Sequence, residues 1–128
     1  MDYQALYHIV SIAESTSGPF DYFDPSHCVM GEFLRATGAG IASGPYKSTL
    51  QTLTTLCGED IDRASVLYGG LLPWSSKGKP EACNRALVCS RWRETLAGWE
   101  AQDTLASANR IRTLTSAHWF EKECQPSA

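Results

Sequence analysis

The residues most capable of chemistry lie around Cys28, in the run Asp24–Cys28 (DPSHC). Asp24 is a favourable N-cap and Pro25 a favourable first helical residue, so this pattern predicts Cys28 in the first turn of a helix. The helix dipole there favours a thiolate, and papain-like cysteine hydrolases place their nucleophile in this way. With His118 as the base, the pair could serve a cysteine-dependent hydrolase or transferase.

Three features of the sequence oppose this catalytic hypothesis. The carboxylates of Asp21 and Asp24 would raise the pKa of the thiol, whereas a nucleophile needs a lowered one. Papain-like enzymes carry the histidine on a strand, and the second half of the chain shows no strand pattern. The residues around Cys28 also match no protease signature. The simpler interpretation, which we favour, is a buried helix cysteine that packs beside Val29 and Gly31.

Metal and cofactor chemistry have less support. The five cysteines are an odd number without a Cys-x-x-Cys pair, which is typical of reduced thiols and not of a zinc site or a disulfide framework. The glycine-rich run Gly38–Gly44 lacks the Gly-Lys-Ser/Thr ending of a phosphate-binding loop. We therefore predict no metal ion and no cofactor.

Acidic residues are concentrated in the first half of the chain. Residues 1–62 carry eight acidic and two basic residues, and residues 63–128 carry nine basic and six acidic ones. This imbalance disfavours direct nucleic-acid binding and suits a basic protein surface, although ordinary solvated faces would also explain it. Trp74 or Trp119 is expected to be partly exposed at an interface, because tryptophan is frequent in binding hot spots. The candidate binding residues are therefore Asp21, Asp24, Glu59, Asp60, Asp62 and Trp74.

Helical spacing of apolar residues dominates the chain, and strand-like alternation is nearly absent. We predict an all-α fold, a compact bundle of five to seven helices with glycine-rich loops, in a single helical domain over residues 1–128. The expected helices follow Asp2, Asp24, Gly44, Asp60 and Pro80, and a last one follows Asp103 and runs to about Cys124. The run Ser75–Pro80 is expected to be an exposed loop.

Neither a membrane span nor a secretory signal is expected. No apolar run approaches the roughly 18 residues that cross a bilayer, and the N-terminal residues lack a basic and then apolar segment. We therefore predict a cytoplasmic protein without membrane contact.

Several segments resemble those of a group of small uncharacterised proteins that are common in phages and their hosts. The Cys28-x-x-Gly31-x-x-Leu34 pattern resembles their cysteine helix, and Phe20–Asp24 resembles the aromatic-Asp segment before it. The later Leu67–Gly70 segment and Trp74 are similar to their Leu-aromatic-Gly turn and following tryptophan. The resemblance covers about a third of the chain and lacks the Gly-Thr-Ala-Cys run that often introduces the helix. It implies a phage-like context and a cytosolic location in a bacterial host cell, with no established activity to transfer.

Three functional hypotheses follow from these patterns. The first is a non-enzymatic protein-binding module, in its sharpest form a phage-type inhibitor of a bacterial defence complex, as anti-CRISPR proteins are. Its partner would be a host protein complex, and the module would bind the basic surface with which that complex holds nucleic acid. The second is the cysteine-dependent enzyme with Cys28 and His118. The third is a homodimer with structural or regulatory function, which is compatible with the first.

Overall fold

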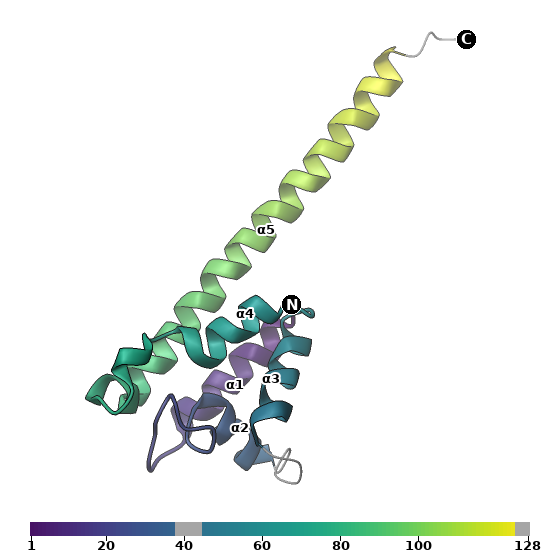
Figure 1. The fold of residues 1–128 in the computed structure, drawn as a ribbon. Helices are drawn as coiled ribbons and strands as arrows, with labels where there is room; N and C mark the ends of the chain where they lie inside the picture. The colour runs from purple at the N-terminus through teal and green to yellow at the C-terminus, as the bar shows by residue number, and fades with distance from the viewer. Residues whose placement is uncertain (38–44, 125–128) are drawn as a thin grey trace. The chain divides into compact units, whose positions relative to one another are not determined.

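The computed structural model describes the backbone of residues 1–37 and 45–124, and the surroundings of side chains within 1–37 and 49–111. Over the described backbone the chain is helical and contains no strand, so the predicted all-α fold is confirmed (Figure 1). The predicted loop at Gly38–Gly44 lies outside the described residues. The α-helices are α1 (Tyr3–Ser15), α2 (Val29–Thr37), α3 (Pro45–Leu56), α4 (Ile61–Ser65) and α5 (Arg85–Cys124).

Two helix starts are capped as the sequence predicts. The Asp2 carboxylate accepts a hydrogen bond from Ala5 N at 3.1 Å, and the Asp60 carboxylate accepts one from Arg63 N at 3.1 Å. Each carboxylate satisfies a backbone N–H that has no partner within its own helix. These caps set where α1 and α4 begin.

Two predicted boundaries are wrong. The run Ser75–Pro80 is not a plain loop, because the 3₁₀ segments η2 (Trp74–Ser76) and η3 (Pro80–Cys83) occupy its ends. The predicted helix start at Asp103 does not exist, because α5 continues through this position without interruption. A residue that can cap a helix is also tolerated on the surface inside one when its neighbours favour helix.

The contacts of the chain form two units, Met1–Leu96 and Ala97–Ala128. The first unit contains α1 to α4, the short helical segments and the first turns of α5. Its core includes Trp92, which is 1% exposed. The other large apolar side chains of this unit that are fully buried come from α1, α2, α3, α5 and the turn that follows α4. They are Leu6, Ile9, Val10, Val29, Met30, Leu53, Leu67, Val88 and Leu96.

The chain beyond α4 continues as a π-helical turn, η1 (Val66–Gly70). The buried hydroxyl of Tyr22 lies against this turn, where it donates to Leu67 O at 2.9 Å and accepts from Leu71 N at 3.0 Å. Burial raises the pKa of this phenol well above its usual range, so it stays a neutral donor. The phenol thus satisfies backbone groups that a regular α-helical end would leave to water, and π turns of this kind are frequent at functional sites.

Candidate functional site

Cys28 lies immediately before α2, not in its first turn. Glu32 N donates to Cys28 O at 2.9 Å, and the Cys28 thiol sulfur accepts from Gly31 N at 3.4 Å. Cys28 is therefore the residue that caps α2, and the predicted helix start at Asp24 and Pro25 is wrong. The thiol takes the place of the hydroxyl or carboxylate that usually accepts from the first turn of a helix.

Asp24 instead closes a turn in the loop before α2. Its carboxylate accepts from Ser26 N at 2.9 Å, and its carbonyl accepts from Cys28 N at 2.8 Å. Asp21 forms a similar turn three residues earlier, where its carboxylate accepts from Phe23 N at 3.0 Å. This local hydrogen bonding competes with helix formation, which explains why the helix starts later than its sequence predicts.

The environment of the Cys28 thiol is unsuited to a nucleophile. Cys28 is 4% exposed, and its burial raises the pKa of the thiol, with the nearby Asp24 charge acting in the same direction. A raised pKa leaves little thiolate at neutral pH. The proposed base, His118, lies outside the residues whose side chains the structure describes. The described residues therefore give the catalytic hypothesis no support.

Thiol labelling tests this conclusion. Among the described cysteines, Cys83 is exposed, whereas Cys28, Cys57 and Cys89 are buried. Burial raises the pKa of Cys57 and Cys89 to about 11 from the usual 9.0, which leaves about a hundredfold less thiolate at neutral pH. We expect iodoacetamide at pH 7 to label Cys83 well before these three, as followed by peptide mass spectrometry. Preferential labelling of Cys28 at pH 6 would contradict this and restore the catalytic hypothesis.

The acidic candidate residues fall into two groups. Asp21 and Asp24 are half-buried in the loop before α2, while Glu59, Asp60 and Asp62 lie where α3 turns into α4. Asp60 is the cap of α4, and Glu59 has a positive φ of 63° in the tight turn before it. The second group is thus explained by the start of α4, where acidic side chains favour the helix dipole. The first group lies beside the pocket described next.

Trp74 is exposed, as the sequence predicts for one of its tryptophans. Its residue surface is 69% accessible, although its ring makes two contacts. The Phe23 ring meets it edge to face at 5.4 Å between centroids, and Lys77 Nζ lies 4.5 Å from the ring centroid. Phe23 and Lys77 thus fix the orientation of the ring, while most of its apolar surface remains exposed to solvent. Such exposure is unusual, because tryptophan rings gain much free energy from burial.

A pocket of about 330 Å³ lies beside this tryptophan. It is formed by the loop before α2 and, some 40 residues later, by the π turn after α4 and the neighbouring η2. Aromatic side chains dominate its walls, and the Cys28 thiol contributes to them. The lining residues are Tyr22, Phe23, Pro25, Cys28, Tyr68, Gly69 and Trp74. The sequence singled out Trp74 and Cys28 as candidates, whereas Tyr68 entered only as part of the Leu67–Gly70 segment of the resemblance and was not a candidate site residue.

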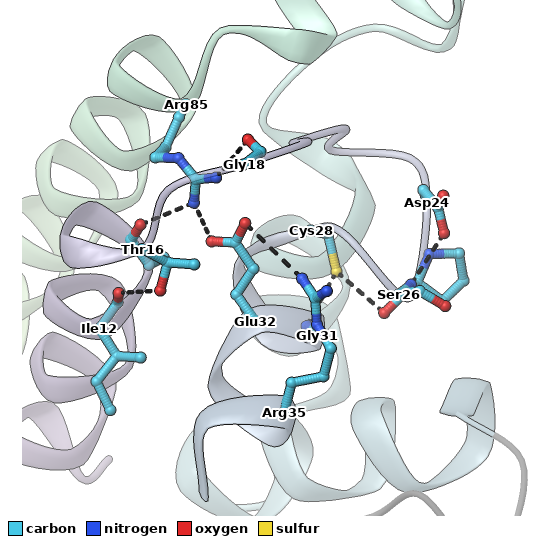
Figure 2. A network of polar contacts seen from close by, with 12 residues as sticks. Ile12, Thr16, Gly18, Asp24, Ser26, Cys28, Gly31, Glu32, Arg35 and Arg85 are labelled. Atoms are coloured by element: carbon cyan, nitrogen blue, oxygen red, sulfur yellow. Dashed lines mark hydrogen bonds and ion pairs between the residues drawn. The ribbon is translucent and has the colours of Figure 1, made fainter.

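A feature that was not predicted from the sequence is the ion pair between Arg85 and Glu32. The Glu32 side chain is fully buried, and Figure 2 shows Arg85 reaching it from the start of α5. Arg85 also donates to Ala13 O at 2.9 Å and to Gly18 O at 3.1 Å, and its guanidinium lies 5.0 Å from the Phe20 ring centroid. One side chain thus connects α1, α2, α5 and the loop that leads to the pocket.

The fold and the pocket together define an all-α protein with an aromatic pocket and a buried ion pair. No family model, no curated protein and no solved structure matches the chain. Among the described residues, no cluster of histidine, cysteine and acidic side chains could hold a metal ion. No helix in the described part of the chain has both the length and the apolarity to cross a membrane.

Proposed function

We propose that the protein is a protein-binding module that contacts its partner through Trp74 and the adjacent aromatic pocket. The observation that carries this proposal is the exposure of Trp74 in a fixed setting between Phe23 and Lys77. Tryptophan is among the residues most enriched in binding hot spots, because its large ring gains much from the exclusion of water. A ring that is already held in place loses little conformational entropy when a partner covers it.

The more specific form of the proposal is an inhibitor of a bacterial defence complex, of the anti-CRISPR kind. Two features support it: the resemblance of the Cys28–Leu34 and Phe20–Asp24 segments to phage proteins, and the acidic first half of the chain. The carboxylates of Asp21 and Asp24, in the loop that contributes to the pocket, would suit a basic surface that normally holds nucleic acid. Identification of the captured partner tests whether the protein inhibits a bacterial defence complex.

An affinity capture with matched variants tests the proposal. We expect the wild-type protein to retain a stoichiometric protein partner from bacterial lysate at low salt, and less of it at moderate salt. Trp74→Ala should weaken this binding by about 30-fold or more, as loss of a hot spot worth about 2 kcal/mol requires. Ile61→Ala is the control, because Ile61 is also exposed, at 57%, but lies in α4 and does not line the pocket.

Two outcomes would contradict the proposal. Equal recovery of the partner by Trp74→Ala and wild type would exclude the pocket as the contact surface. Recovery of no partner at either salt concentration would exclude a heterologous complex. Light scattering at micromolar concentration would then show whether the chain binds a second copy of itself.

A further inference from the structure

The walls of the Trp74 pocket have the character of a cation site. Phe23, Tyr68 and Trp74 line it, and the face of an aromatic ring carries partial negative charge that attracts cations. One of these rings already holds an ammonium group, since Lys77 Nζ lies 4.5 Å from the Trp74 ring centroid. The Trp74 ring thus accepts a positive charge, and an incoming cation would displace Lys77 from it.

A carboxylate beside the pocket, that of Asp24, also favours the binding of a cation. Asp24 lies in the loop between two lining residues, Phe23 and Pro25, and is half-buried. It is joined directly to the pocket wall, because its carbonyl accepts a hydrogen bond from the backbone N of the lining residue Cys28 at 2.8 Å. Only one of its two carboxylate oxygens is used by Ser26 N, so the other can accept a further hydrogen bond. Once Lys77 has left the ring, this carboxylate attracts a cation and repels an anion, and a neutral apolar side chain gains nothing from it.

The size of the pocket limits what can enter. Its volume of about 330 Å³ is near the lower end of the roughly 300–1,000 Å³ found for ligand pockets. A single long side chain fits this volume better than a larger ligand does. We infer that the pocket binds one basic side chain, a lysine or an arginine, presented by a protein partner. This inference rests on the proposed function and names the chemistry of its partner.

A titration with blocked amino acids tests the inference. The probes are N-acetyl-lysine amide and N-acetyl-arginine amide, and their neutral counterparts are N-acetyl-norleucine amide and N-acetyl-citrulline amide. We expect the cationic probes to shift the amide resonances of Tyr68 and Gly69 and the indole resonance of Trp74 in ¹H–¹⁵N spectra of the full chain. Their affinity should exceed that of the neutral probes by about tenfold, as a cation–π contact with a nearby carboxylate predicts. The tighter of the two cations identifies the preferred side chain.

Two charge-removing variants complete the experiment. Asp24→Asn retains the oxygen that accepts from Ser26 N, so the loop keeps its turn while its charge is removed. It should weaken the cationic probes several-fold and leave the neutral probes unchanged. Asp62→Asn removes an equal charge from an exposed residue outside the pocket and should change neither.

The possible failures are distinguishable from those of the proposed function. Equal affinity for lysine and norleucine probes, or shifts confined to residues outside the pocket, would overturn the inference. Partner capture that depends on Trp74 without any response to the cationic probes would also overturn it, while the proposed function would stand. Specific cation binding without any captured partner would support the cation site and overturn the proposed function.

Discussion

Replacing Arg85 with alanine is expected to lower the free energy of unfolding by about 3–5 kcal/mol. The large cost arises because the Glu32 side chain is fully buried and would lose the partner that compensates its charge. Within the described part of the chain, the other ionic contact of Glu32 is to Arg35, whose side chain is about half exposed and lies 4.0 Å away. The variant also loses the hydrogen bonds to Ala13 O and Gly18 O. Urea denaturation followed by circular dichroism measures the change.

Arg93→Ala is a matched control for this prediction. Arg93 lies two turns later on α5 and likewise pairs with a glutamate, through two hydrogen bonds to Glu14 of α1. The Glu14 side chain is 38% exposed, so water replaces the lost partner, and we expect a cost of at most about 1 kcal/mol. Equal effects of the two substitutions would contradict the importance that we assign to the burial of Glu32.

The double variant Arg85→Met with Glu32→Leu separates the buried charge from the packing of the side chains. Because it removes both ions, it should recover much of the stability that Arg85→Ala loses. Its remaining deficit would measure the hydrogen bonds of Arg85 to α1 and the following loop. A double variant that is as unstable as the single one would show that these hydrogen bonds, and not the unpaired carboxylate, carry the effect.

The helices of the first unit could be predicted largely from local signals. Capping residues such as Asp2 and Asp60 act on backbone groups three residues away, so their effect is written into adjacent sequence. The start of α2 was predicted wrongly because Asp24 has two local options, a helix cap and a turn. The protein adopts the turn, in which Asp24 accepts from Ser26 N and Cys28 N, and the same local sequence is compatible with either option.

The site was harder to predict than the fold, because its residues come from distant segments. An exposed tryptophan was expected from composition, but the π turn that brings Tyr68 beside Trp74 depends on the hydroxyl of Tyr22, more than 40 residues earlier. The Glu32–Arg85 pair likewise joins residues 53 positions apart. A weak signal existed for Glu32, since it lies one helical turn after Val29 on the buried side of α2. An acidic residue in an apolar stripe indicates a buried partner.

Gly31→Ala is expected to destabilise the protein by about 1–3 kcal/mol or more, although alanine favours helix over glycine by about 1 kcal/mol. A Cβ atom at this position would overlap Pro25 O and lie 2.8 Å from Ser26 C. All of these neighbours are backbone atoms of the loop before α2, so no side-chain rotation can relieve the overlap. The glycine of the Cys-x-x-Gly pattern therefore permits the close approach of loop and helix. Urea denaturation again measures the effect.

Gly98→Ala is the control that separates crowding from helix propensity. Gly98 is also inside a helix, but a Cβ atom there would meet nothing within 4 Å, so this substitution should stabilise the protein by up to about 1 kcal/mol. Opposite signs for the two substitutions would establish the close contact at Gly31, and equal signs would contradict it. Because Pro25 both touches this position and lines the Trp74 pocket, Gly31→Ala should also weaken partner binding under conditions where the variant remains folded. Gly98→Ala does not alter that loop, so its binding should equal that of the wild type.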